Sequence, residues 1–176
     1  MRQKPPVSPF LLFLFLTARL WFPSTATAAV TDACSVLTGA DAEAALGEPV
    51  GPPKSEVRPS GAGQAPVCKF RSTQGSAMKA KTVSVSIRYG PDDLGNKMSA
   101  ISENEKSAGY KNVHDVGGVG DGAVWGTTSM MGRTMGELTV RKGNSVMLVI
   151  LIGGIQDEAN ALEHAKTLAA KVLPKI

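Results

Sequence analysis

The sequence predicts an α+β domain in which helices pack on one face of an antiparallel sheet, with one disulfide bond. Residues 83–89 alternate apolar and polar side chains, which is typical of an antiparallel sheet buried on one face. Gly143-Asn144 separates two strand-like segments and predicts a tight hairpin. Helical patterns lie between the strands without regular strand–helix alternation, which favours α+β over a parallel α/β fold. The 176 residues fit one domain.

The first segment, residues 1–28, is expected to be a cleavable secretory signal peptide. Arg2 and Lys4 give it a positively charged start, a short apolar run occupies residues 10–16, and Ala26-Thr27-Ala28 supplies the small residues that signal peptidase accepts. The apolar run is shorter than the about 20 residues that a spanning helix needs. We therefore expect residues 29–176 to form a single exported domain, either secreted or periplasmic, with no stable transmembrane segment after cleavage.

Two alternatives to a released domain stay open. The leader could remain as a membrane anchor, or Cys34 could carry a lipid. Lipid attachment requires small residues beside the cysteine and a Leu-like residue three positions before it, whereas here Asp32 and Thr31 occupy this region. The sequence therefore predicts a protein without a lipid anchor.

The net charge argues against nucleic acid as a partner. The chain has a formal charge of +4 and 19 basic residues, but Arg2, Lys4 and Arg19 belong to the expected leader. Without these three, 16 basic residues face 15 acidic ones. A nearly neutral domain lacks the electrostatic footprint of a nucleic-acid-binding protein.

The two cysteines, Cys34 and Cys68, are expected to form a disulfide bond because export places them in an oxidising compartment. Closing a loop of about 35 residues stabilises a protein by about 3–4 kcal/mol in the chain-entropy treatment. Their spacing is far from C-x-x-C, and no cluster of histidines accompanies them, which disfavours a metal or redox pair.

The first elements of the exported domain are expected to be a helix and a loop. Thr38 is suited to cap a helix over residues 37–47, with Asp41 three residues on and Gly47 at its end. Residues 48–66 hold five of the eleven prolines, so a loop or an irregular edge strand is expected there.

The middle of the chain is expected to contain strands on either side of a helix. Residues 68–71 and 83–89 alternate as strands, Pro91 opens a helix that Gly109 ends, and residues 110–116 form a further strand.

A hairpin and a final helix complete the predicted domain. The hairpin pairs residues 137–141 with residues 146–152, and the second of these is apolar throughout, which predicts a central strand. A last helix carries an apolar stripe from Ala161 to Leu173, and Pro174 stops it.

The glycine-rich segment before Trp125 matches the loose dinucleotide pattern, Gly118-x-Gly120-x-x-Ala123. That fingerprint requires a helix to begin at the glycines, but strand and turn residues follow here. We expect instead a tight glycine turn that allows Trp125 to enter the core.

No catalytic residue is predicted, and the protein is not expected to be an enzyme. The chain contains two histidines, His114 and His164, and no G-x-S-x-G motif. A catalytic triad assembled from residues distant in the sequence remains open.

No metal site and no cofactor are predicted. Met130, Met131 and Met135 are soft ligands of the kind that Cu(I) prefers, but they lack a regular M-x-M or M-x-x-M series. Methionines also serve adaptable binding surfaces, so Met130 and Met131 are the candidate interaction surface. Asp92, Asp93 and Asp121 do not form a calcium-binding loop, which contains ligands at fixed positions.

Several segments resemble a family of uncharacterised bacterial exported domains of unknown function, of the kind found in actinobacterial lipoproteins. The segments are Asp32-Ala-Cys-Ser-Val-Leu-Thr38, Ala45-Leu-Gly47-x-Pro49-Val50, Cys68-x-Phe70, Val116-Gly-Gly-Val-Gly-Asp-Gly-Ala-Val-Trp125 and Leu138-x-Val140-x-x-Gly143. The resemblance implies a secreted or envelope-attached domain with a Cys34–Cys68 bridge, and it transfers no catalytic residue. Many members carry a lipid-attached cysteine, which this sequence lacks in convincing form.

The sequence as a whole predicts an exported, non-catalytic binding or envelope-associated module. Its partner would be an envelope or extracellular protein or a small ligand. An inhibitor of an exported enzyme is the first alternative, with residues 48–66 or 127–133 as contact loops. A hydrolase with an unrecognised active site is the second.

Overall fold

The computed structural model describes residues 32–60, 63–76, 79–90, 98–143 and 146–176, so the expected signal peptide lies outside the described residues. The strands are β1 (Lys54–Ser60), β2 (Gly63–Arg71), β3 (Thr82–Tyr89), β4 (Lys111–Val116), β5 (Gly122–Met130), β6 (Arg133–Lys142) and β7 (Val146–Gly153). The α-helices are α1 (Gly39–Leu46), α2 (Met98–Ser107) and α3 (Glu158–Val172), and the short 3₁₀ helices are η1 (Ala33–Ser35) and η2 (Leu173–Lys175).

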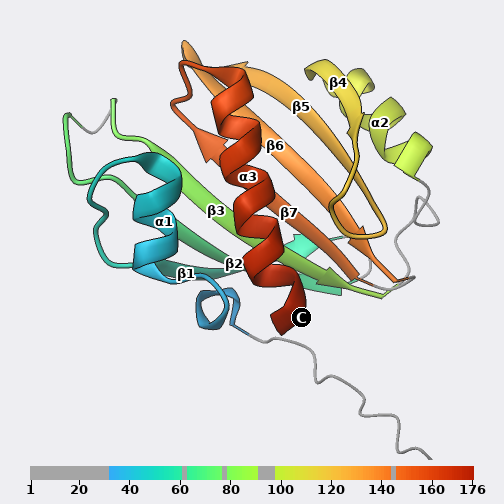
Figure 1. The fold of residues 1–176 in the computed structure, drawn as a ribbon, viewed down its shortest axis with the longest axis horizontal. Helices are drawn as coiled ribbons and strands as arrows, with labels where there is room; N and C mark the ends of the chain where they lie inside the picture. The colour runs from blue at the N-terminus through green and yellow to red at the C-terminus, as the bar shows by residue number, and fades with distance from the viewer. Residues whose placement is uncertain (1–31, 61–62, 77–78, 91–97, 144–145) are drawn as a thin grey trace, which may run out of the picture.

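The described strands form one antiparallel sheet in the order β1-β2-β3-β7-β6-β5-β4 (Figure 1). The α+β class, the antiparallel sheet and the disulfide bond that the sequence predicts are therefore confirmed. Strand β7, predicted to be central, lies between β3 and β6 in the middle of the sheet. The outermost strands are β1 and β4.

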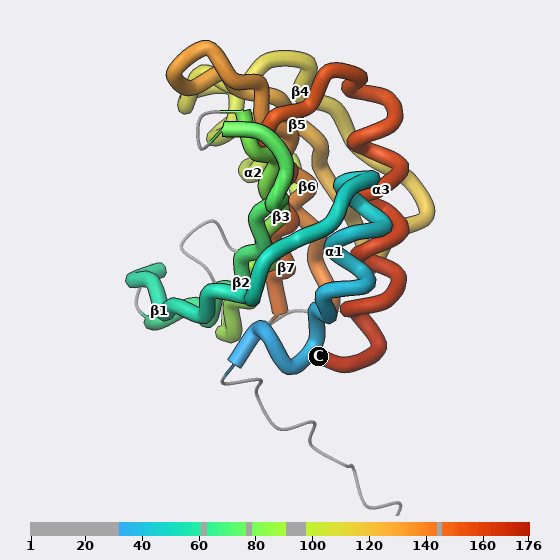
Figure 2. The backbone as a smooth tube through the Cα atoms, turned by 90° about the vertical axis from the view of Figure 1, so that its left-hand side faces the viewer, coloured from blue at the N-terminus to red at the C-terminus, as the bar shows by residue number. Residues whose placement is uncertain are grey.

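The helices cover the two faces of the sheet unequally. Helices α1 and α3 pack on one face, where they enclose the main core, whereas α2 lies on the other face against β4 and β5 (Figure 2). Successive side chains of β5 point to opposite faces of the sheet. Trp125 belongs to the main core, whereas the adjacent Val124 packs with Ile101 of α2. The sequence predicted helices on one face, and the structure adds the second, smaller layer.

The glycine-rich segment is a turn between two strands, as expected. Gly118 and Gly120 adopt positive φ angles of 76° and 58°, and the chain then enters β5 instead of a helix. Trp125 is completely buried in the main core. The turn thus directs a large aromatic side chain inward and does not have the helical context of a dinucleotide site.

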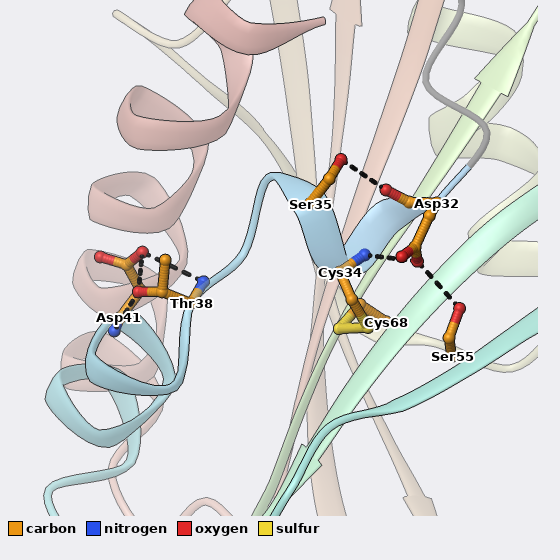
Figure 3. Close-up of a disulfide and its surroundings, with 7 residues drawn as sticks. All are labelled: Asp32, Cys34, Ser35, Thr38, Asp41, Ser55 and Cys68. Atoms are coloured by element: carbon orange, nitrogen blue, oxygen red, sulfur yellow. Dashed lines mark hydrogen bonds between the residues drawn. A yellow bond between two sulfur atoms is a disulfide. The ribbon is translucent and has the colours of Figure 1, made fainter.

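The N-terminal elements are fixed to the sheet by the disulfide bond and by local capping (Figure 3). Cys34 in η1 is bonded to Cys68 in β2, with an S–S distance of 2.09 Å. The Asp32 carboxylate accepts hydrogen bonds from the Cys34 amide (3.0 Å) and from the Ser55 hydroxyl (2.9 Å). Helix α1 begins at the predicted cap, where Thr38 and the residue three positions on form a capping box, and ends at Gly47 with φ of 68°.

Residues 48–66, expected to be a loop or an irregular edge strand, contain an edge strand, and residues 127–133, expected to be a loop, are mostly strand. Residues 48–66 include edge strand β1 and the first residues of β2, which pair from Lys54↔Lys69 to Ser60↔Gly63. Residues 127–133 complete β5 and begin β6, leaving only Met131-Gly132 as the turn. Both turn residues have positive φ, 52° and 73°, which is the backbone of a tight hairpin. Methionine is unusual in this conformation, which is why a hairpin was not predicted at this position.

The predicted helix beginning at Pro91 is described from Met98 onward, since residues 91–97 lie outside the described part. Its end agrees with the prediction, because Gly109 follows α2 with φ of 86°. No helix in the described ranges is both long and apolar enough to cross a bilayer.

Candidate functional site

One end of the molecule, termed here the loop end, gathers the β5–β6 turn (residues 131–132) and the connection from β7 to α3 (residues 154–157). The backbone amides of Gly154 and Ile155 donate to the Thr134 carbonyl over 2.9 and 3.2 Å. The Arg133 guanidinium donates to the Ala80 carbonyl, which links the hairpin to the segment before β3. Figures 1 and 2 show the hairpin tip and the start of α3 at the same end.

Two exposed methionines stand at the tip of this hairpin. The side chains of Met130 and Met131 are 60% and 91% exposed. Among the described residues, the only other large hydrophobic side chain with such exposure is Val57, at 55%, on the distant edge strand β1. The predicted interaction surface is therefore accessible, and it presents flexible thioethers suited to an adaptable contact.

A groove of about 290 Å³ opens at the same end, between α1, α3 and the ends of β3 and β7. Its apolar lining includes Ile152 and Ala161, and its polar lining includes Lys81, Asn160 and His164. This volume is near the lower limit of small-molecule sites, and the mixture of apolar and polar lining is typical of them.

Two polar groups of the groove have structural partners already. The Lys81 ammonium donates to the Leu46 carbonyl over 2.9 Å, which satisfies the C-terminal end of α1. Asp157 caps α3, since its carboxylate accepts from the Asn160 amide over 3.2 Å. The remaining polar lining, His164 among it, could bind a small polar ligand through hydrogen bonds.

Neither histidine is hydrogen-bonded to a nucleophile among the described residues. The His114 Nδ1 atom is 2.7 Å from the Asn112 carbonyl oxygen on exposed strand β4. His164 lines the groove. In the described part of the chain, neither ring forms a hydrogen bond with a serine or an aspartate. The described residues also contain no group of three or more His, Cys, Asp or Glu side chains that could hold a metal ion.

A second polar cluster lies on the opposite face, beneath α2, and is called here the α2 carboxyl cluster: Glu105, Tyr110, Glu137 and Thr139. The Tyr110 hydroxyl donates to Glu137 Oε2 over 2.6 Å, and the Thr139 hydroxyl lies 3.4 Å from Glu137 Oε1. Glu105 is only 7% exposed, and neither of its carboxyl oxygens has a hydrogen-bond partner.

The electrostatic environment of this cluster disfavours negative charge. Burial raises the pKa of Glu105 to about 7, and the charge of Glu137 adds to the rise. The nearby Thr139 hydroxyl opposes the rise only in part, because it donates to Glu137 and not to Glu105. Burial also raises the pKa of Tyr110 well above its ordinary value, as do its hydrogen bond to Glu137 and the two nearby carboxyl groups.

This cluster was not predicted from the sequence. A signal existed in the helical spacing, because Glu105 is four residues after Ile101 and so lies on the same buried side of α2. Glu137, however, comes from strand β6, and its position opposite the helix depends on the register of the sheet.

Comparison with known proteins adds no relative: no family model, no curated protein and no solved structure matches the chain. The resemblance to bacterial exported domains of unknown function therefore stays a prediction from its motifs. The candidate site depends on the geometry of this molecule alone.

Proposed function

We propose that this protein is an exported, non-catalytic binding module whose contact surface is the loop end. The observation that carries the proposal is the pair of exposed methionines, Met130 and Met131, on the hairpin beside the groove. The paired strands β5 and β6 hold the backbone of the tip, so docking has to order the two methionine side chains but not the backbone. The partner is an envelope or extracellular protein or a small ligand.

Export is supported by the cysteine chemistry. A disulfide bond persists in oxidising compartments and is rare in the cytosol, and Cys34 and Cys68 form one. The Cys34 sulfur is engaged in this bond and has no thiol with which to carry a lipid. A released domain produced by cleavage after Ala28 thus fits the chemistry better than a lipid-anchored one.

A non-catalytic role is supported by the surroundings of the histidines. A general base must lie within about 3.2 Å, measured between heavy atoms, of the group whose proton it takes. The His114 ring contacts a backbone carbonyl, and His164 lines a groove without a hydrogen-bonded serine or aspartate in the described part of the chain.

Inhibition of an exported enzyme is the second candidate, and the hairpin favours it. Met131 has a φ of 52° and an almost fully exposed side chain at the turn. In this role the tip would enter the cleft of an enzyme, and the strands behind it would hold the tip in one conformation.

The test uses the chain expressed with its own leader and a C-terminal tag. The intact mass of the exported protein should correspond to a chain beginning at Ala29. Immobilised wild type, the double variant Met130→Ser/Met131→Ser and the control Val57→Ser are exposed to envelope and culture fractions. We expect a specific partner to bind wild type and Val57→Ser and to bind the double variant at least tenfold more weakly.

Equal binding to all three proteins would refute the loop end as the contact surface. If the captured partner is an enzyme, its activity is then measured with each protein. Loss of its activity only with wild type and Val57→Ser would establish inhibition.

A further inference from the structure

Helix α2 is attached to the rest of the protein by a small contact area. Of its ten residues, only Ile101 and Glu105 are buried. Ile101 packs with Val124 and Met147 in a cluster separate from the main core. Met98, at the start of the helix, is partly buried against the same cluster. One of the two buried residues of this helix is therefore an acid, an arrangement that costs free energy whenever the acid is charged.

The position of Glu105 is defined by the sheet beneath it. A β-carbon on Gly126 would be 2.9 Å from Glu105 Oε2, so the carboxyl group occupies space that the glycine leaves open. Gly126 pairs with Glu137 in the β5–β6 register. The Glu105 carboxyl group thus lies over Gly126, next to the strand position of Glu137. The Glu137 carboxylate already accepts a hydrogen bond from Tyr110.

No cation neutralises Glu105 in the described part of the structure. The elements packed against α2 are β4 and β5, and Glu137 projects from the neighbouring strand β6. Asp115 of β4 and Arg141 of β6 share this face of the sheet. Asp115 lies opposite Val124 and Arg141 opposite Gly122, so both are farther along the strands than Gly126. On α2 itself the charged residues Glu103 and Lys106 are exposed.

We propose that Glu105 is a proton-operated latch for α2: as a neutral acid it docks the helix, and its ionisation releases the helix and uncovers the apolar patch of Val124 and Met147. This device is independent of the loop end, which lies elsewhere in the molecule. It makes the accessibility of one sheet face depend on the acidity of the surroundings.

The direction and size of the effect follow from proton linkage. A carboxyl group titrating near 7 when docked and near 4.5 when solvated binds its proton more tightly in the docked state. Docking is therefore favoured at low pH and weakens as the pH rises from about 4.5 to about 7. Between pH 5.5 and 8.5 the equilibrium constant for helix release should increase about 30-fold.

Hydrogen–deuterium exchange of the exported protein tests this directly. After correction for the intrinsic pH dependence of exchange, α2 amides should lose about 30-fold in protection between pH 5.5 and 8.5, whereas α3 amides should not change. Glu105→Gln removes the ionisable group and should give the same α2 protection at both pH values. Glu103→Gln removes an exposed charge from the same helix and should behave as wild type.

A direct titration provides the second measurement. The side-chain carboxyl carbon of Glu105, followed by NMR, should titrate near pH 7. A midpoint near 4.5 would overturn the proposal, as would α2 protection that does not change with pH in the wild type. A pH dependence that persists in Glu105→Gln would also overturn it.

Discussion

At the scale of single residues, the tightest constraint is the contact between Trp125 and Gly136. Trp125 is fully buried, and its indole N–H donates to Glu158 Oε1 over 3.1 Å. A β-carbon on Gly136 would be 2.1 Å from Trp125 Cη2, closer than any real contact allows. The glycine of β6 is therefore required by the aromatic side chain of β5.

Gly136→Ala should accordingly destabilise the protein by about 2–4 kcal/mol, because the indole ring must move within a close-packed core. Urea unfolding at neutral pH measures the loss. Gly117→Ala is the matched control, since Gly117 has no atom within 4 Å of the added methyl group, and we expect a change below about 0.5 kcal/mol there. Equal losses in the two variants would contradict this account.

At this scale, features set by residues close together in the chain were easier to predict than features set by contacts between strands. The burial of Trp125, the glycine turn before it and the Thr38 cap depend on neighbours within a few residues, and these predictions are confirmed. The need for Gly136 and the isolation of Glu105 depend on which residues face each other across strands. Periodicity shows which residues share a face but not which strand lies beside them.

At the scale of elements, one carboxylate links α1 to α3 in addition to their apolar packing. Asp41 completes the capping box of α1 and also accepts a hydrogen bond of 2.6 Å from Lys171 of α3. The hydrogen bond from Lys171 and that from Thr38 lower the pKa of Asp41 to about 2. Since Lys171 is 48% exposed, solvent screening reduces the stabilisation to about 1–2 kcal/mol.

Asp41→Asn should remove about 1–2 kcal/mol of stability at pH 7. A carboxyl group with a lowered pKa in the folded state stabilises at pH values above about 4, and this contribution disappears as the pH falls towards 2. The difference between variant and wild type in thermal unfolding should therefore vanish near pH 2. Glu163→Gln, which breaks the Lys166–Glu163 pair on the surface of α3, should change stability by less than about 0.5 kcal/mol.

Prediction at the element scale was strongest for strands with a clear pattern, either alternating or apolar throughout, and weakest at turns. The strand 83–89 and the central strand 146–152 agree closely with β3 and β7. The β5–β6 turn was missed because Met131 adopts a positive φ that is normally occupied by Asn or Gly. Strand β1 was expected only as a loop or an irregular edge strand, because Pro52 and Pro53 precede it and Pro59 interrupts it.

At the scale of the whole molecule, the disulfide bond ties the N-terminal segment to the sheet across 34 residues of sequence. Replacing both Cys34 and Cys68 by serine should lower the free energy of unfolding by about 3–4 kcal/mol, through the greater freedom of the unfolded chain. Denaturant unfolding measures this loss, and reduction of the wild type with a thiol should reproduce it. A loss below about 1 kcal/mol would indicate that the bridge adds little to the fold.

The position of β7 has a further consequence for how the protein is made. The middle of the sheet joins β3 to β7, so that Val85 pairs with Ile150, and α3 closes the core only afterwards. A chain that emerges N-terminus first cannot complete this ladder until its final third is free, because β3 has no partner on one side before then. Such long-range pairing delays folding. The sheet therefore closes only after β7 has emerged, and under the proposed export this delay would keep the polypeptide extended while it is translocated.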